Sequence, residues 1–442
     1  MKIVNGWICR IGRNRVIPTF GDIEIKNGII NRIIPKSFSP KILSKPKIKK
    51  GIYNAGGAVI TIPQVNFHDH FYSRLAKGLN IKGSMDSFHD ILHNLWWKLD
   101  RALTLEMVEA LAQMSVIESI KSGTTYIFDH HASMNAISGS LDIIAENIIS
   151  NNLRGVLCFE ATDRNGGRIA ENSLNENVKF IERNENDNIR GMLGLHASFT
   201  LSDDTLEAAS EIVREYNLGI HIHLCEDTTD RVLSKEITGK YPVQRLTQYN
   251  LINDKSILAH GIYLTKRDCD IIDDMGSSLA FNPDSNLNNG VGTPDFIGLP
   301  ESIPMLMGTD GMHANPGRSL KNVFLFMRAN GISFDETFHR ISKIYFDQIV
   351  FVKKYFKDYP MLTKGDRADL VIWDYTPPTP ITSNNFFGHY IYGILERRPK
   401  TVMQSGSFLL KNNSLVGINE NKVNASIYEQ GEKLFRKFGR MK

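Results

Sequence analysis

The sequence predicts an α/β protein: a (β/α)8 TIM-type barrel with a small β-sandwich formed by the N- and C-terminal segments. Eight apolar, strand-like segments alternate with longer helix-like segments between residues 58 and 362. Strands that are apolar throughout are typical of a parallel sheet covered by helices on both faces, and eight such units favour a closed barrel. The segments 1–57 and 363–442 contain short strands and turn residues instead, too few for two independent sheets. We therefore expect them to meet in one sandwich, which the barrel of 58–362 interrupts.

The predicted barrel strands are short runs of mostly apolar residues bounded by turn or helix signals. They cover 58–67, 122–130, 153–160, 189–196, 217–224, 255–261, 277–283 and 303–309. Between them, apolar residues recur at helical spacing, most clearly in 104–121 and 203–216. In the N-terminal segment, Asn-Gly pairs beginning at Asn5 and Asn27 mark turns between strands.

Composition excludes several classes of protein. The 442 residues are 42% hydrophobic and 23% charged, which is ordinary for a globular protein. Lys and Arg number 52 against 48 Asp and Glu, and a net charge of +4 gives no reason to expect a nucleic-acid partner. The four cysteines are scattered, which favours free thiols in a reducing compartment. We find no apolar run of 18 residues and no secretory leader, so we expect no membrane span and a cytoplasmic location.

Polar residues at the ends of the predicted strands carry the chemistry. The first strand ends in His68-Asp69-His70, and strand alternation puts the two imidazoles on one face. Further side chains of this kind end the fifth, sixth and eighth strands, namely His221, His223, Glu226, His260 and Asp310. A lone histidine is more often a core residue than a ligand. An ordered set of imidazoles and a carboxylate at one end of a barrel instead predicts a site for a divalent transition metal with room for a water.

These residues resemble a known family. The order H-x-H, H-x-x-E, a lone His and T-D-G is similar to that of the metal-dependent amidohydrolase superfamily, in the branch of aminohydrolases and chlorohydrolases that act on ring amidines and triazines. Three further blocks resemble the SsnA group of aminohydrolases within that branch: NLWWKLDRAL at 94–103, FDHHAS at 128–133 and FEATDRN at 159–165. The resemblance covers nearly the whole chain.

The resemblance implies a role for each residue that matches the family pattern. It makes His68, His70, His223 and Asp310 the metal ligands, with Asp310 also accepting a proton from the attacking water. It makes Glu226 the proton shuttle and His260 the partner of developing charge. His221 shares a strand face with His223, so spacing alone does not separate them, and the family's H-x-x-E pattern selects His223.

The resemblance also bears on the number of metal ions. Binuclear relatives carry a bridging carboxylated lysine at the end of the fourth strand, where this chain has Gly194-Leu195-His196. We therefore expect one divalent ion per chain, zinc in first place and iron as the alternative.

Substrate contacts are predicted from the resemblance and from position at the strand ends. The resemblance makes His196, after the fourth strand, a substrate contact. Position adds His131 after the second strand, with His130 as its alternative, and Glu160 after the third. Trp96 and Trp97 are expected to pack over the barrel mouth or at a subunit contact rather than to stack on a ligand.

The predicted activity is hydrolysis of C–N bonds other than peptide bonds, with deamination of a planar nitrogen heterocycle by a metal-activated water in first place. Hydrolysis of a cyclic amide or of a ring chloride at the same site is the alternative among enzymes. A catalytically silent barrel that serves binding or assembly is the alternative from another class. The resemblance further implies a homodimer and a small heterocyclic substrate.

Overall fold

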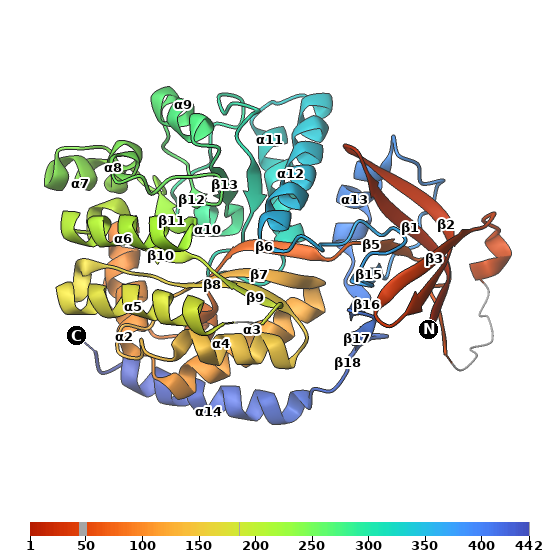
Figure 1. The fold of residues 1–442 in the computed structure, drawn as a ribbon, viewed down its shortest axis with the longest axis horizontal. Coiled ribbons are helices and arrows are strands. Elements are labelled where there is room, and N and C mark those ends of the chain that lie inside the picture. The colour runs from red at the N-terminus through yellow and green to blue at the C-terminus, as the bar shows by residue number, and fades with distance from the viewer. Residues whose placement is uncertain (44–50, 185, 442) are drawn as a thin grey trace.

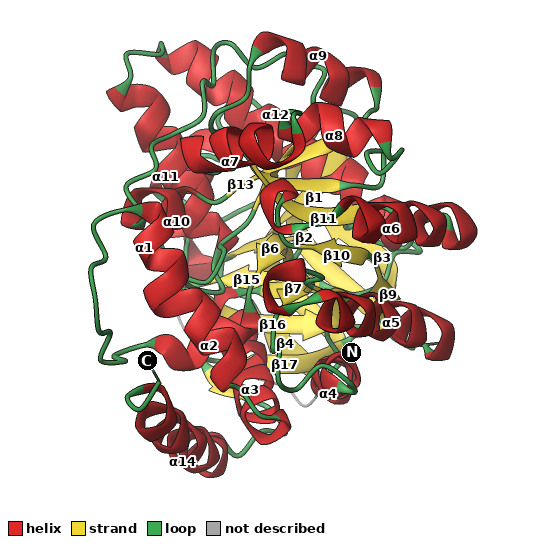
Figure 2. Ribbon diagram, turned by 90° about the vertical axis from the view of Figure 1, so that its left-hand side faces the viewer, coloured by secondary structure: helices red, strands yellow, loops and turns green. Residues whose placement is uncertain are grey.

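The computed structural model describes residues 1–43, 51–184 and 186–441. Helices surround a group of parallel strands, and a second, mostly antiparallel sheet lies beside this unit (Figure 1). In the view of Figure 2 the helices form an outer layer around the central strands.

The parallel strands lie in two sheets that isolated bridges connect. One sheet has the order β6-β7-β8-β9 and the other the order β10-β11-β12-β13-β14. Bridges between Asp69 and Asp310 and between Ala161 and Leu195 join the two sheets at both ends. The strands are β6 (Gln64–Asp69), β7 (Thr124–His131), β8 (Arg154–Phe159), β9 (Ile189–Gly191), β10 (Leu193–Leu195), β11 (Ile220–Leu224), β12 (Ile257–His260), β13 (Ser278–Phe281) and β14 (Met305–Met307). Each of the eight predicted barrel segments contains at least one of them.

Burial explains why these segments form parallel strands. Every residue of β7 and β8 is buried, so both faces of the sheet are covered. The covering helices are α1 (Phe88–Ile91), α2 (Trp97–Ala102), α3 (Leu105–Ser122), α4 (Ser140–Ser150), α5 (Gly167–Arg183), α6 (Asp203–Tyr216), α7 (Thr228–Thr238), α8 (Pro242–Gln248), α9 (Lys266–Asp274), α10 (Pro283–Asn288), α11 (Pro316–Ala329) and α12 (Phe334–Tyr355). A π-helical turn, Leu92–Trp96, joins α1 to α2.

Capping residues fix where the helices begin and end. The Thr104 side chain accepts a hydrogen bond from the backbone N–H of Met107, and Gly123 ends α3 in the left-handed conformation. Thr265 and Asp268 form a reciprocal capping box at the start of α9. These local signals agree with the predicted helix boundaries at 104–121 and 203–216.

Both ends of the chain contribute to one nine-stranded sheet. Its strands are β1 (Lys2–Gly12), β2 (Arg15–Lys26), β3 (Ile29–Pro35), β4 (Ile52–Asn54), β5 (Val59–Thr61), β15 (Leu370–Trp373), β16 (Pro399–Gln404), β17 (Ser407–Lys411) and β18 (Ser414–Leu415). Strand β5 lies between β1 and β15 and so connects the N-terminal strands to the C-terminal ones. The hydrogen bonds describe one continuous sheet, and its packing as a sandwich stays a prediction.

Two predicted boundaries need correction. The segment 58–67 divides at Ile62-Pro63: β5 belongs to the terminal sheet, and the parallel strand starts at Gln64. Pro63 lacks the N–H that a continuous strand would need, which accounts for the break. The segment 363–442 also contains more than sheet, because it includes the helices α13 (Phe386–Tyr392) and α14 (Glu420–Phe438).

Helix α14 returns to the helical layer of the barrel. It contacts α2 and α3 and buries Leu434 and Phe438, and the two views place it along the outside of these helices (Figures 1 and 2). The end of the described chain therefore packs against the barrel rather than against the terminal sheet.

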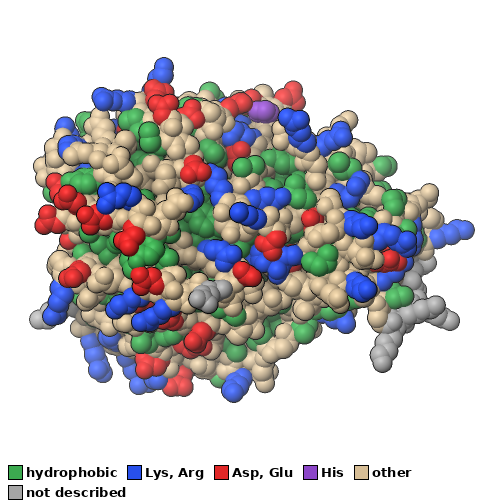
Figure 3. All heavy atoms as spheres, in the orientation of Figure 1, with side chains coloured by type: hydrophobic (Ala, Val, Ile, Leu, Met, Phe, Trp, Pro, Cys, Tyr) green, Lys and Arg blue, Asp and Glu red, His purple; other side chains and the backbone are tan. Residues whose placement is uncertain are grey.

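None of the helices in the described part of the chain combines the length and apolar content that a membrane span requires. On the face shown in Figure 3, both basic and acidic side chains are spread over the surface, in keeping with the nearly balanced charge. Cys9, Cys158, Cys225 and Cys269 are free and buried.

Candidate active site

Three strand ends carry residues in the left-handed backbone region. Cys225 follows β11 with φ 48°, His260 ends β12 with φ 75°, and Asp310 follows β14 with φ 50°. This conformation is costly for residues with a side chain and tends to persist where the surrounding structure holds a functional group in place. The strained residues mark the end of the barrel at which the predicted site lies.

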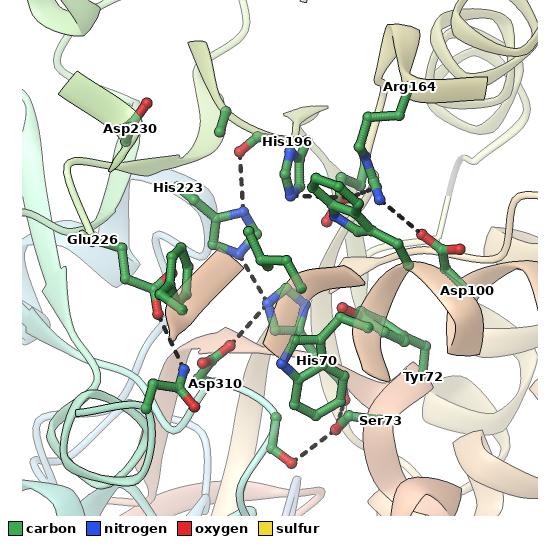
Figure 4. A pocket seen from close by; sticks show the side chains of 18 of the residues that line it. His70, Tyr72, Ser73, Asp100, Arg164, His196, His223, Glu226, Asp230 and Asp310 are labelled. Atoms are coloured by element: carbon green, nitrogen blue, oxygen red, sulfur yellow. Dashed lines mark hydrogen bonds and ion pairs between the residues drawn. The ribbon is translucent and has the colours of Figure 1, made fainter. Parts of the chain in front are cut away.

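Four predicted ligands converge at this end. One donor atom each of His68, His70, His223 and Asp310 lies within 4.8 Å of the others, an arrangement that could hold a metal ion. Nε2 of His70 is 3.0 Å from Nε2 of His223 and 2.9 Å from Oδ1 of Asp310. Nε2 of His68 is 3.5 Å from the same Asp310 oxygen. Figure 4 shows His70, His223 and Asp310 directed toward one another.

Hydrogen bonds on the outer side of the rings define the tautomers. Nδ1 of His70 lies 2.6 Å from the His130 carbonyl oxygen, and Nδ1 of His223 lies 3.0 Å from the His196 carbonyl oxygen. A carbonyl can only accept, so each Nδ1 carries a proton and each Nε2 is the nitrogen that faces the other donors. Nε2 of His221 lies 2.8 Å from Nδ1 of His68. Sequence spacing left His221 and His223 equivalent; the structure puts His221 behind His68 and His223 in the donor set.

The donor set fits a divalent cation. Two imidazole nitrogens and a carboxylate oxygen face one another at close range, and Nε2 of His68 has no hydrogen-bond partner among the described residues. A cation at the centre of this group would satisfy all four donors. Three nitrogens and one oxygen are also the ligand types that zinc and iron accept.

The pKa values of Asp310 and Glu226 shift in opposite directions although both groups are buried. Burial would raise the pKa of Asp310, but the imidazoles of His68 and His70, 3.5 and 2.9 Å from its Oδ1, outweigh it and hold this pKa well below its usual range. Burial raises the pKa of Glu226 well above its usual range, and the charge of Asp310 adds to the effect. Ser285 donates a hydrogen bond to Asp310, and Nδ2 of Asn289 lies 3.3 Å from Oε1 of Glu226. The surroundings therefore favour the ionised form of Asp310 and the protonated form of Glu226.

His260 lies between these two carboxyl groups. Its Nδ1 is 2.9 Å from Oδ1 of Asn286, an oxygen that can only accept, so Nδ1 carries the proton. Its Nε2 is 3.4 Å from Oε2 of Glu226 and has no hydrogen-bond partner within the described residues. The geometry brings His260, Glu226 and Asp310 together as predicted, and their donor atoms also lie within 4.8 Å of one another.

A cavity of about 670 Å³ opens next to these groups. His70, His223, Glu226 and Asp310 line one end (Figure 4). Aromatic and apolar side chains line another part, and these are Tyr72, Phe88, Leu92, Trp96, Trp97 and Phe199. Trp97 packs between the ring of His93, with centroids 4.4 Å apart, and the guanidinium of Arg164 at 4.8 Å. Both tryptophans thus lie at the barrel mouth, where the sequence predicted packing.

Two of the three predicted substrate contacts line the cavity. Glu160 is buried, and Nη2 of Arg164 lies 2.9 Å from its Oε1. His196 has its Nδ1 2.7 Å from Oγ1 of Thr200, whose own proton is donated to the Ala197 carbonyl. Nδ1 of His196 is therefore the donor, and its Nε2 presents a lone pair 3.9 Å from Oε1 of Glu160. Burial holds the pKa of His196 well below its usual range, so the ring is neutral.

His131 is a correction to the predicted contacts. It is fully buried and is not among the residues that line the cavity. Its Nε2 is 2.9 Å from Oγ of Ser133, which donates to the Ala136 carbonyl. Its neighbour His130 bonds the carbonyls of Leu195 and His221 through Nε2. Consecutive strand residues face opposite sides, so His130 reaches carbonyls of strands β10 and β11, whereas His131 reaches the turn that follows β7.

Asp100 is a cavity residue that the sequence analysis did not single out. It lies on α2 with an exposed fraction of 2%, and its Oδ2 is 3.3 Å from Nη1 of Arg164. Burial raises its pKa to about 7, although Arg164 opposes the shift. In the sequence, the available signal for Asp100 was an aspartate close to two tryptophans on one helical segment.

Comparison with known proteins decides the family. The sequence profile of the amidohydrolase family matches residues 59–339, well over half of the chain. The chain belongs to the amidohydrolase family. The predicted family is thus confirmed, and this amidohydrolase carries all four candidate metal ligands at strand ends within the matched region.

Curated relatives match this amidohydrolase over nearly its whole length. A protein of Methanococcus aeolicus named 5'-deoxyadenosine deaminase is 27% identical over 433 residues, which cover 94% of this chain and 95% of that protein. A 5-methylthioadenosine/S-adenosylhomocysteine deaminase of Thermococcus onnurineus is 27% identical over 377 residues, 82% of this chain and 85% of that one.

Solved structures of low sequence identity share the fold. An adenosine deaminase of Xanthomonas campestris with bound zinc superposes with a TM-score of 0.80 at 17% identity and covers 98% of both chains. An atrazine chlorohydrolase of Arthrobacter aurescens, a variant complexed with zinc and atraton, gives a TM-score of 0.77 at 16% identity and covers 97% of this chain and 99% of that one. This amidohydrolase therefore has the TIM-barrel type of fold with mixed α and β content.

Proposed function

We propose that this amidohydrolase removes an amino group from a planar nitrogen heterocycle by hydrolysis. Water adds to the ring carbon that bears the amino group, the C–N bond breaks, and ammonia leaves while the carbon retains the oxygen. One observation carries the proposal: three imidazole nitrogens and a carboxylate oxygen converge within 4.8 Å beside a buried carboxyl group, Glu226, whose pKa burial raises. The names of the two curated relatives, both deaminases of adenosine derivatives, agree with this reaction class.

One metal ion belongs to the proposal, with zinc expected and iron as the alternative. His68, His70, His223 and Asp310 would hold it. The chemistry that such an ion supplies when bound is activation of a water molecule near neutral pH. A second donor group combines His130 and Glu160 with His223, but His223 has only one free nitrogen because its Nδ1 bonds the His196 carbonyl. Competition for that nitrogen supports a single ion.

We assign the proton transfers to two carboxyl groups. Glu226 would donate its proton to a ring nitrogen, which makes the neighbouring carbon more electrophilic; it would then take the proton of the added hydroxyl as the carbonyl forms and pass it to the leaving amine. Asp310, whose pKa is lowered and which lies close to His70, would accept a proton from the attacking water and return it to Glu226 at the end of the cycle. His260 lies between them with a free Nε2 and would orient the nucleophile.

We assign recognition of the ring to Glu160 and His196. Both present hydrogen-bond acceptors toward the cavity, so both suit N–H groups on the edge of a heterocycle. Closure of the parallel strands into one barrel, a homodimer and a cytoplasmic location complete the proposal and stay predictions.

A product screen with the zinc-loaded protein tests the function. Purines, pyrimidines, pterins and triazines are offered in turn, beginning with 5'-deoxyadenosine, and ammonia and the organic product are both measured. We expect ammonia and the oxo-substituted ring in equal amounts from at least one class. A ring-opened acid without ammonia, or halide from a chlorinated ring alone, would assign the site to the alternative hydrolyses. No turnover of any compound at full zinc occupancy would contradict the proposal.

A further inference from the structure

The charges that line the cavity are unequal in number. Arg164 is the sole lysine or arginine that lines the cavity, as far as the structure describes the chain. Five carboxyl groups share the lining with it: Asp100, Glu160, Glu226, Asp230 and Asp310. Any negatively charged part of a ligand would therefore depend on Arg164 for a positively charged partner outside the candidate metal centre.

Each of the three guanidinium nitrogens of Arg164 already has an oxygen partner within the protein. Nη2 lies 2.9 Å from Oε1 of Glu160, Nη1 lies 3.3 Å from Oδ2 of Asp100, and Nε lies 3.1 Å from Oγ1 of Thr162. One face of the guanidinium covers the ring of Trp97 at 4.8 Å. The side chain is only 10% exposed, so its bonds are shielded from competing water. Figure 4 shows the pair that Arg164 forms with Asp100.

The carboxylates of Asp100 and Glu160 neutralise the charge of Arg164, and each also occupies one of its nitrogens. One guanidinium is held by two buried acids, and a buried unpaired oxygen, Oδ1 of Asp100, remains on the same cluster. A phosphate or carboxylate that entered would lose its hydration without gaining a cationic partner whose charge is free, and it would meet like charge. A neutral or cationic group would meet acceptors instead.

We propose that the substrate carries no phosphate and no carboxylate: the site takes a free base, or a nucleoside-like heterocycle with a neutral or cationic substituent, and rejects nucleotides. This inference rests on the proposed function for the reaction, but it concerns the charge of the molecule that enters. Asp100 and Glu160 set the selection by neutralising Arg164. The aromatic side chains of the cavity lining accept the uncharged part of the substituent.

Matched substrate pairs test the selection. The zinc-loaded protein is given adenosine and AMP, guanosine and GMP, and cytidine and CMP at pH 8, where Asp100 is ionised. We expect kcat/KM for the accepted nucleoside to exceed that of its monophosphate by about 100-fold or more. A monophosphate that is turned over within tenfold of its nucleoside overturns the inference.

Phosphate titration decides the inference even where no pair is turned over. Inorganic phosphate is titrated calorimetrically at pH 8 into the zinc-loaded wild type, into Asp100→Asn/Glu160→Gln, and into the same double variant with Arg164→Gln. We expect the double variant to bind phosphate at least about tenfold more tightly than the wild type, and the triple variant to lose this gain. Equal affinity of wild type and double variant overturns the inference, whereas absence of ammonia from every heterocycle contradicts the proposed function instead. Circular dichroism of all three proteins establishes that they fold alike.

Discussion

Nε2 of His70 and Nε2 of His223 lie 3.0 Å apart, while the outer nitrogen of each ring donates to a backbone carbonyl. The carbonyls of His130 and His196 thus determine which nitrogen of each ligand is free. Both inner nitrogens face one point, next to Oδ1 of Asp310. The two backbone carbonyls therefore orient the nitrogens that are expected to bind the metal.

Removing one of these nitrogens should weaken zinc binding. His223→Ala takes away one of four donors, and we expect zinc affinity to fall by about 100-fold or more. Calorimetric titration of the metal-free protein measures the affinity. His339→Ala is the matched control, because His339 is exposed on α12 and remote from the donor set. Unchanged affinity in His223→Ala would put the ion elsewhere.

The proton on Glu226 should be required for turnover but not for metal binding. Glu226→Gln keeps the shape and loses the transferable proton, so kcat should fall by about 10²- to 10⁴-fold with zinc content unchanged. Glu236→Gln, on the exposed face of α7, should behave as wild type. Kinetics with the best substrate of the product screen, together with elemental analysis, give both quantities. A Glu226→Gln variant with wild-type kcat would require another proton donor.

Stability should fall as the pH rises toward neutrality because of Asp100. Its pKa is about 7 in the folded protein, against an ordinary value of 3.8. The folded state therefore binds the proton more tightly than the unfolded state, and between these pH values each increase in pH reduces the free energy of unfolding. Asp100→Asn removes this contribution, so the variant should gain about 1–3 kcal/mol relative to wild type between pH 5 and pH 8. Denaturant titration of both proteins at pH 5 and pH 8 measures the free energies of unfolding. An equal loss in wild type and Asp100→Asn would refute the prediction.

Helix α14 should contribute to stability through its buried residues. Leu434 is fully buried and Phe435 next to it is 51% exposed, so the pair offers a test within one helix. Leu434→Ala should lower the free energy of unfolding by about 2–4 kcal/mol, and Phe435→Ala by less than about 1 kcal/mol. Urea denaturation followed by circular dichroism compares them. Equal effects would mean that α14 does not dock on the barrel in solution.

The sequence predicted the parallel strands from local pattern, and the candidate metal ligands from their place at the strand ends together with the family resemblance. Apolar runs mark buried strands, and alternation alone puts His68 and His70 on one face. It did not separate His221 from His223, since residues two apart share a face and only the contact with His68 distinguishes them. His131 was expected at the substrate because its strand ends there, and its contact with Ser133 depends on a turn that alternation does not describe. Helix α14 was missed although apolar residues recur at helical spacing in it, because strand signals dominate the preceding residues.

The pairing of β5 with β15 also has a consequence for synthesis of the protein. Thr61 of β5 pairs in antiparallel register with Val371 of β15, which comes 310 residues later in the chain. At a translation rate of about 5–20 residues per second, β5 has no partner on that side for roughly 15–60 s after it leaves the ribosome. Its open edge, made of Val59, Ile60 and Thr61, is apolar and able to pair with other strands. The nascent chain is therefore vulnerable at this strand until the barrel is complete, and chaperones that cover exposed strand edges would act on it during that interval.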